Sequence, residues 1–249
     1  MKKVAMITGG TGGIGLATAK ALGKSGFDII LNGIDEEQAK YAIKELKELG
    51  IGVDFYLYDV TKEEDVLAGF EKICEKYDKI DVLVNNAGGL AGRSRFEGMT
   101  TEFYRRVMGL NLDSVFFNTR AAIPLLKKGE YASIVNFTSI AGWNSGGPGA
   151  GVYGTAKAAV TTMTRALAKD LAEFGIRVNA VSPGTIDTAF HADIKKKNID
   201  LFNSWKNNIL LKRLGQAEEV ASVIDFLVSD KASFVTGEII QINGGQAFL

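Results

Sequence analysis

TGGTGGIG, residues 8–15, decides the fold because it joins a short apolar run to the start of a helical pattern. The run Val4–Thr8 has the length and composition of a buried strand, and the helical pattern begins at Ile14. Gly10–Gly15 matches the spacing G-x-G-x-x-G. Glycines at this spacing permit a tight turn, let the backbone approach a pyrophosphate, and direct the free N–H groups of a helix N-terminus toward it. The stretch therefore predicts a dinucleotide-binding strand, turn and helix.

The rest of the chain repeats this alternation of short apolar runs and longer amphipathic segments. The further predicted strands are Asp28–Leu31, Val53–Tyr58, Ile80–Val84, Ser133–Phe137, Arg177–Val181 and Glu238–Ile242. The predicted helices are Ile14–Ser25, Glu36–Leu49, Glu63–Tyr77, Glu102–Leu126, Tyr153–Glu173 and Ala217–Leu227. Most of the strands are apolar throughout, as in a parallel sheet covered on both faces. We expect a single α/β domain over residues 1–249, a Rossmann-type doubly wound sheet of seven mainly parallel strands with helices on both faces.

Composition limits the function. The 249 residues hold 29 Lys and Arg against 29 Asp and Glu, so no basic excess favours a nucleic-acid or membrane-surface partner. The N-terminal Met-Lys-Lys precedes only four apolar residues, too few for a signal peptide, and no run reaches the roughly 20 residues of a membrane span. We expect a cytoplasmic protein. The single cysteine, Cys74, is interpreted as buried filler in the third helix, and one histidine with one cysteine argues against a metal site.

The segment YGTAK, residues 153–157, supplies a candidate catalytic pair. Residues four apart share one face of a helix, so the Tyr153 phenol and the Lys157 ammonium can address one pocket. A phenol titrates near pH 10, and a nearby positive charge lowers that pKa toward a useful range. Ser139, at the end of the fifth predicted strand, lies fourteen residues upstream and can donate to a carbonyl oxygen.

These motifs, together with NNAG (85–88) and PGTIDT (183–188), make the chain resemble the short-chain dehydrogenase/reductase (SDR) family over essentially its whole length. The resemblance implies that Tyr153 is the general acid and base, that Ser139 polarises the carbonyl, that Lys157 tunes Tyr153 and holds the nicotinamide ribose, and that Asn111 supports a proton path. It also implies a homotetramer packed through the fourth and fifth helices and the C-terminal strand. The expected cofactor-binding residues are Gly9, Thr11, Gly13, Ile14, Gly15, Gly33, Asp35, Asp59, Val60, Asn86, Ala87, Gly88, Tyr153, Lys157, Pro183, Gly184, Ile186 and Thr188.

The end of the second predicted strand bears on the choice of cofactor. It continues into Asp35-Glu36-Glu37, and the glycine loop contains no basic residue. These acids would repel the 2′-phosphate of NADP, while Asp35 can accept from a ribose hydroxyl. Asp35 can equally cap the following helix. NAD(H) is therefore preferred and NADP(H) stays possible, because Gly33 stands where NAD-using members of the family often carry Asp.

Three stretches are expected to face the substrate: residues 88–93, 141–151 and 187–193, the last leading into a predicted lid over 187–212. Together they resemble one subgroup, the reductases of 4-deoxy-L-erythro-5-hexoseulose uronate (DEH), which form 2-keto-3-deoxy-gluconate during alginate breakdown. Arg93 is a candidate clamp for the substrate carboxylate, although it can also be a solvated cation or pair with Glu97. Trp143 and His191 are candidate pocket residues, together with Ser139 and Tyr153.

Other functions remain open on the same motifs. A 3-oxoacyl-(acyl carrier protein) reductase commonly uses NADPH and an acidic carrier; Asp35 argues against the first, while Arg105 and Arg106 allow the second. Another sugar or hydroxy-acid dehydrogenase of the family is a further alternative. A non-catalytic dinucleotide sensor would have no need of Ser139, Tyr153 and Lys157 together.

Overall fold

The computed structural model describes residues 2–188, 196 and 199–248. Seven strands form one sheet in the order β3-β2-β1-β4-β5-β6-β7, and every neighbouring pair is parallel. The strands are β1 (Lys3–Ile7), β2 (Phe27–Gly33), β3 (Val53–Leu57), β4 (Val82–Asn85), β5 (Ser133–Phe137), β6 (Arg177–Pro183) and β7 (Ile239–Ile242). The predicted single doubly wound α/β domain is confirmed. The strand order reverses between β1 and β4, so a crevice is expected at the carboxyl ends of these strands.

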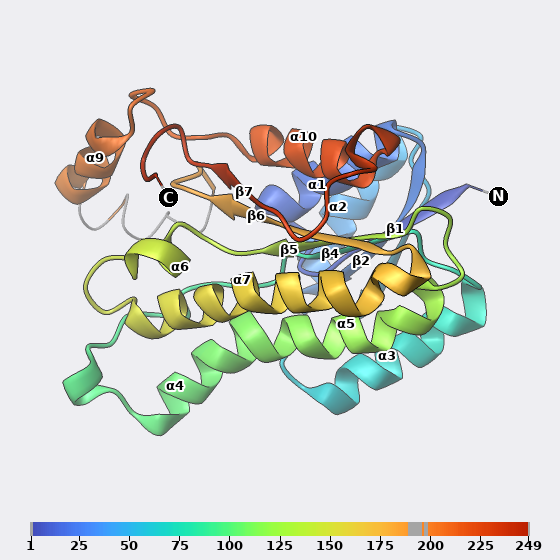
Figure 1. Ribbon diagram of the computed structural model, residues 1–249, viewed down its shortest axis with the longest axis horizontal. Coiled ribbons are helices and arrows are strands. Elements are labelled where there is room, and N and C mark those ends of the chain that lie inside the picture. Colours follow the sequence, from blue (N-terminus) through green and yellow to red (C-terminus); the bar gives the residue numbers. More distant parts are fainter. Residues whose placement is uncertain (1, 189–195, 197–198, 249) are drawn as a thin grey trace.

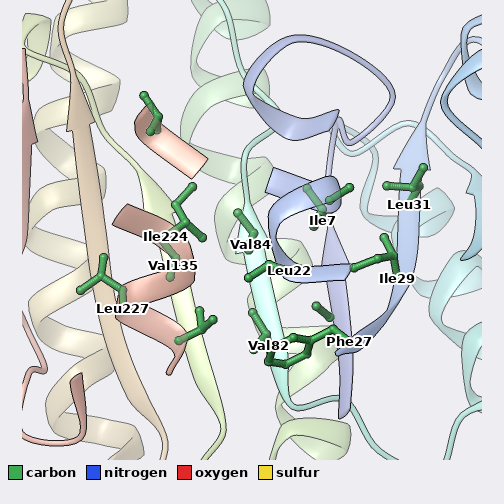
Figure 2. Packing of buried hydrophobic residues seen from close by; sticks show 14 of the residues in the cluster. Ile7, Leu22, Phe27, Ile29, Leu31, Val82, Val84, Val135, Ile224 and Leu227 are labelled. Carbon is green, nitrogen blue, oxygen red and sulfur yellow. The ribbon is translucent and has the colours of Figure 1, made fainter. Parts of the chain in front are cut away.

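Helices cover both faces of the sheet (Figure 1). One layer holds α1 (Gly13–Lys24), α2 (Glu36–Glu48) and α10 (Ala217–Val228); the other holds α3 (Glu63–Lys76), α4 (Thr101–Met108), α5 (Ser114–Leu126) and α7 (Gly151–Leu171). Alternate side chains of β1 enter different layers: Ile7 packs in the cluster of Leu22 from α1, and Met6 packs in the cluster of Phe70 from α3. Figure 2 shows the first cluster between the sheet and α1 and α10. Each such buried side chain stabilises the fold by about 1.5–3 kcal/mol.

The predicted helix Glu102–Leu126 is divided. A π-helical segment, η2 (Gly109–Asp113), separates α4 from α5. Asn111 lies in this segment, and its side-chain Nδ2 donates to the carbonyl of Val107 at 2.9 Å. That carbonyl is the one that would accept the Asn111 backbone N–H in a regular α-helix. The side chain thus competes with the helical ladder, which the apolar periodicity did not show.

Cys74 is exposed, so its interpretation as buried filler is wrong. The neighbouring Ile73 takes the fully buried position on α3. One residue along an α-helix turns the side chain by about 100°, which places Cys74 on the solvent side.

Two described helices have no counterpart in the predicted alternation: α6 (Ala141–Asn144) and α9 (Ile199–Asn208). The second falls in the predicted lid over 187–212, of which residues 189–195 and 197–198 lie outside the described residues. Among the helices that the structure describes, none is both long and apolar enough to cross a bilayer.

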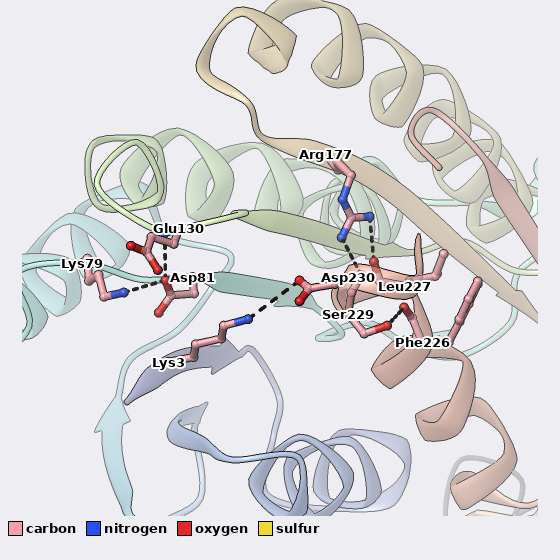
Figure 3. A network of polar contacts seen from close by, with 9 residues as sticks. All are labelled: Lys3, Lys79, Asp81, Glu130, Arg177, Phe226, Leu227, Ser229 and Asp230. Atoms are coloured by element: carbon pink, nitrogen blue, oxygen red, sulfur yellow. Dashed lines mark hydrogen bonds and ion pairs between the residues drawn. The ribbon is translucent and has the colours of Figure 1, made fainter. Parts of the chain in front are cut away.

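Polar contacts hold the amino ends of the strands together (Figure 3). Asp81, a buried carboxylate just before β4, accepts from the backbone N–H of Val4 at 2.8 Å and from Lys79 Nζ at 2.9 Å. Arg177, at the start of β6, donates to the carbonyl of Leu227 at 2.7 Å, near the end of α10. Side chains therefore fix the amino ends of the strands, and the cavity lies at their carboxyl ends.

Candidate active site

One large cavity, about 1070 Å³ in volume, lies at the carboxyl ends of the strands. Loops that follow β1, β2, β3, β4, β5 and β6 line it, together with α9 and the segment after β7. Ligand pockets in proteins commonly occupy about 300–1,000 Å³, so this cavity has room for a dinucleotide and a small substrate.

The glycine loop forms one wall of the cavity. Gly9 and Gly13 have φ values of +59° and +52°, in the left-handed region that favours glycine. A Cβ at Gly15 would lie 2.5 Å from the carbonyl oxygen of Gly9, so the loop folds back on the first turn of α1 with no room for a side chain. Gly15 itself does not line the cavity but lets the turn close behind it. The N-terminus of α1 thus opens toward the cavity, as a pyrophosphate site requires.

Two asparagines tie this loop to neighbouring strands. Asn86, after β4, donates from Nδ2 to the carbonyls of Thr8 at 3.0 Å and Gly9 at 2.9 Å. Asn32, near the end of β2, accepts from the N–H of Gly10 through its own carbonyl at 3.0 Å. Its Nδ2 donates to the carbonyl of Tyr58 at 2.9 Å. The sequence motifs include Asn86 but not Asn32, whose partners Gly10 and Tyr58 lie just after β1 and β3.

The end of the cavity where the sequence predicts the adenosine is lined by Gly33, Ile34, Asp35, Gln38, Asp59 and Val60. Asp35 caps α2 by accepting from the backbone N–H of Gln38 at 3.0 Å, so the capping interpretation is correct; it also lines the cavity. Gln38 was not identified from the sequence. Its Oε1 accepts from the Thr11 hydroxyl at 2.6 Å and so links α2 to the glycine loop.

Ser139, Tyr153 and Lys157 converge on the cavity from the end of β5 and the first turns of α7. The Tyr153 phenol makes a side-chain hydrogen bond with Ser139. Lys157 is only 3% exposed, and its Nζ donates to the carbonyl of Phe137 at 2.9 Å and lies 5.8 Å from the centre of the Tyr153 ring. The two ends of YGTAK therefore share one face of a helix and one pocket, as their spacing predicts.

Burial dominates the electrostatics of this pair. It raises the pKa of Tyr153 above its ordinary 10.0, while the hydrogen bond with Ser139 acts in the opposite direction. Burial lowers the pKa of Lys157 to about 8. The lowered phenol pKa expected from the sequence is therefore not found in the protein alone, because desolvation of the phenol has a larger effect on its pKa than the hydrogen bond with Ser139. A phenol kept protonated near neutral pH is the form that donates a proton to a reduced carbonyl.

Asn111 is fully buried behind this pair and does not line the cavity. Its Oδ1 accepts from the N–H of Gly89 at 3.0 Å, which anchors the loop after β4. A Cβ at Gly88 would lie 2.9 Å from Asn111 Oδ1 and 3.1 Å from Lys157 Nζ. Gly88 therefore allows the side chains of Asn111 and Lys157 to approach the same point.

The segment 183–188 forms the opposite wall. Pro183, Gly184, Ile186 and Thr188, which the sequence analysis assigns to cofactor binding, all line the cavity. A Cβ on Gly13 would lie 3.9 Å from the side chain of Thr188, so this wall approaches the glycine loop across the cavity.

The predicted substrate residues are placed differently from one another. Arg93 lines the cavity and donates from Nη1 to the carbonyl of Pro148 at 3.0 Å, which joins two of the predicted substrate loops. Trp143 is not among the lining residues, and the other tryptophan, Trp205 on α9, takes a place in the wall. His191 lies outside the described residues. Sequence reasoning missed Trp205 and Gln246, which no local motif marks, and it did not assign a role to Thr185 within PGTIDT.

The cavity has a fixed distribution of charge. Of the described residues that line it, only Lys157 and Arg93 are cationic, and only Asp35 and Asp59 are anionic. Both acids lie in the loops after β2 and β3, whereas both cations lie toward Ser139 and Tyr153. The glycine loop, the N-terminus of α1 and the room beside them fit a nicotinamide dinucleotide.

A parallel sheet with this strand order, a glycine loop at its switch point, and a Ser–Tyr–Lys group in the same cavity define an NAD(P)-dependent oxidoreductase. A family model described as enoyl-(acyl carrier protein) reductase matches residues 9–247. The chain is 40% identical over 243 residues to 3-oxoacyl-(acyl-carrier-protein) reductase FabG of Thermotoga maritima, covering 98% of this chain and 97% of the relative. It is 38% identical to cyclopentanol dehydrogenase of Comamonas testosteroni, covering 98% and 96%. The chain belongs to the short-chain dehydrogenase/reductase family.

Solved structures extend the comparison. The structure of NADH-dependent reductase A1-R′, responsible for alginate metabolism, matches with a TM-score of 0.90 and 37% identity, covering 99% of this chain and 98% of that one. An actinorhodin polyketide ketoreductase with NADPH matches with a TM-score of 0.91 and 32% identity, covering 98% and 97%. Relatives thus include proteins described with either cofactor.

Proposed function

We propose that this protein is an NADH-dependent reductase of DEH, forming 2-keto-3-deoxy-gluconate. The observation that carries the proposal is the charge distribution in the cavity: Asp35 and Asp59 line one end, where we place the adenosine ribose, and Arg93 lines the other, where we place the uronate carboxylate. A guanidinium has five N–H donors, so the bond to Pro148 leaves donors for a carboxylate. The similarity to an NADH-dependent reductase of alginate metabolism supports the same substrate class.

The proposed mechanism uses the residues that the fold brings together. The Ser139 hydroxyl donates to the aldehyde oxygen of DEH. NADH, when bound, would supply the hydride for the aldehyde carbon. As the C=O π electrons move onto oxygen, Tyr153 Oη transfers its proton there and the alcohol forms. Lys157 would hold the nicotinamide ribose, and its charge stabilises the phenolate left behind. Asn111 supports the path by which the proton is replaced. We expect residues 187–212 to cover the substrate, with Trp205 and His191 contributing to the pocket. We also expect the protein to be a cytoplasmic homotetramer.

A 3-oxoacyl-(acyl carrier protein) reductase is the second candidate, because FabG proteins are among the most similar relatives. Arg105 and Arg106 on α4 are both exposed, and neither lines the cavity. Exposed cations of this kind suit an acidic carrier, so the test must include a thioester substrate.

Arg93→Ala is expected to raise the KM for DEH about tenfold or more, because a bidentate carboxylate contact is lost. The KM for a neutral aldehyde should change less than about twofold, since that substrate has no carboxylate to pair. Arg95→Ala is the matched control: Arg95 is exposed two residues further on, and it does not line the cavity. Equal effects of Arg93→Ala on both substrates would contradict the proposed clamp.

The wild type is expected to have a kcat/KM for NADH at least about tenfold above that for NADPH, because Asp35 and Asp59 repel the additional phosphate. Gly12→Arg should lower the ratio of kcat/KM for NADH to kcat/KM for NADPH about tenfold, because it adds a cation at the end of the cavity lined by Asp35 and Gln38. Gly12 tolerates a side chain, since its φ is −162° and a Cβ there would meet only the flexible end of Gln38, at 3.3 Å. A wild type that prefers NADPH would overturn the cofactor assignment.

A further inference from the structure

The segment after β7 reaches back into the active site through one side chain. Gln246 lines the cavity, and its Oε1 accepts from the backbone N–H of Thr185 at 2.9 Å. The Thr185 hydroxyl lies 3.1 Å from Gln246 Oε1 and 2.9 Å from Nε2, within hydrogen-bond distance of both ends of the carboxamide. Thr185 is only 8% exposed, so its backbone N–H depends on this protein partner rather than on water.

The segment around Gly184 and the segment after β7 approach each other closely. A Cβ at Gly184 would lie 2.7 Å from Gln246 Oε1 and 2.9 Å from the Cα of Asn243. The backbone N–H of Gly184 donates to the carbonyl of Ile242 at 2.9 Å, which continues the contact from the end of β7. Glycine at 184 is therefore what lets the carboxamide of Gln246 reach Thr185.

The remaining backbone groups of this wall are held by Gly215. Its N–H donates to the carbonyl of Thr185 at 3.1 Å, and its carbonyl accepts from the N–H of Asp187 at 2.8 Å. Between them, Ile186 buries its side chain, which is 4% exposed. Its own N–H and carbonyl make no hydrogen bond with any residue that the structure describes. The wall is fixed on both sides of Ile186, and the backbone donor and acceptor of Ile186 are left for a ligand.

We propose that Gln246 is a positioning residue: by fixing Thr185 it presents the backbone of Ile186 to the carboxamide of the nicotinamide. A carboxamide has one acceptor and two donors, which match one N–H and one carbonyl. The inference rests on the proposed position of the nicotinamide at residues 183–188, and it does not depend on which carbonyl substrate is reduced. In this proposal the segment after β7 contributes to cofactor binding through Gln246.

Gln246→Leu tests this by removing the bonds to Thr185 at similar side-chain size. We expect the Kd for NADH to rise about tenfold, while the Kd for ADP-ribose, which lacks the nicotinamide, stays within about twofold. Gln246→Glu keeps the acceptors for the Thr185 N–H and hydroxyl and should return the NADH Kd to within about threefold of the wild type. Phe248→Ala, an exposed change two residues further along, is the control and should alter neither Kd.

Two results would overturn the proposal: an unchanged NADH Kd in Gln246→Leu, or an equal rise for NADH and ADP-ribose, which would indicate general damage to the site. If Gln246→Leu does not fold, Thr185→Val removes only the hydroxyl contacts and carries the same test. In Thr185→Val we expect the Kd for NADH to rise about threefold more than the Kd for ADP-ribose. Equal rises in the two Kd values would contradict the positioning role of Gln246. These experiments measure cofactor binding, so their outcome does not depend on whether the protein reduces DEH.

Discussion

Tyr153→Phe is expected to lower kcat for carbonyl reduction about 10³-fold, because it removes the only proton that the proposed mechanism donates to the substrate oxygen. The Kd for NADH should change less than about twofold, since the ring remains. Stopped-flow measurement of hydride transfer with saturating NADH gives the rate, and cofactor fluorescence gives the Kd.

Tyr131→Phe is the matched control for this change. Tyr131 is exposed and lies beside the start of β5, at the amino ends of the strands. Its variant should keep full activity. A Tyr153→Phe enzyme that retains more than about a tenth of the wild-type kcat would contradict the role of Tyr153 as the acid.

Lys157→Met is expected to lower kcat about 10²-fold or more and to raise the KM for NADH, because the charge beside Tyr153 and the proposed ribose contact are both lost. Met preserves an apolar stem in a position that is 3% exposed, so the fold should persist. Near-normal kcat in a folded Lys157→Met protein would remove Lys157 from the mechanism.

The same variant has a pH signature in stability. Burial lowers the pKa of Lys157 to about 8 in the folded protein, against 10.5 in the unfolded chain. Between these values the unfolded chain binds one more proton, so the free energy of unfolding of the cofactor-free wild type, relative to Lys157→Met, should rise by about 1.4 kcal/mol per pH unit from pH 8 to 10. Below pH 8 the difference should be flat. Tyr153, whose raised pKa acts above pH 10, is present in both proteins and cancels. Denaturant titrations at each pH measure this, and a flat difference throughout would show that Lys157 is not desolvated.

The parts of the site that the sequence predicted are those set by local spacing. TGGTGGIG places its glycines through the geometry of one turn, and YGTAK places Tyr153 and Lys157 through the pitch of one helix. Both stretches lie against the cavity as expected. The alternation of apolar runs and amphipathic segments likewise predicted the seven-stranded sheet and its helices, because each strand or helix shows its buried side in its own apolar pattern.

The parts that could not be predicted depend on contacts between distant segments. Gln246 and Thr185 are 61 residues apart, and neither belongs to a pattern that marks the other. Trp143 and Trp205 have the same chemistry, and only the packing of α9 puts Trp205 in the wall. The π-helical turn at Asn111 arises from one side chain competing for the carbonyl of Val107, which hydrophobic periodicity does not record.

The central claim is tested most directly by NADH oxidation with purified DEH beside an acetoacetyl thioester, each measured over a range of concentrations. We predict a kcat/KM for DEH at least about 100-fold above that for the thioester, because the proposed clamp at Arg93, which lines the cavity, would pair with a carboxylate that the thioester lacks. Turnover of the thioester alone, or a higher kcat/KM for it than for DEH, would contradict the proposed substrate and favour the 3-oxoacyl reductase.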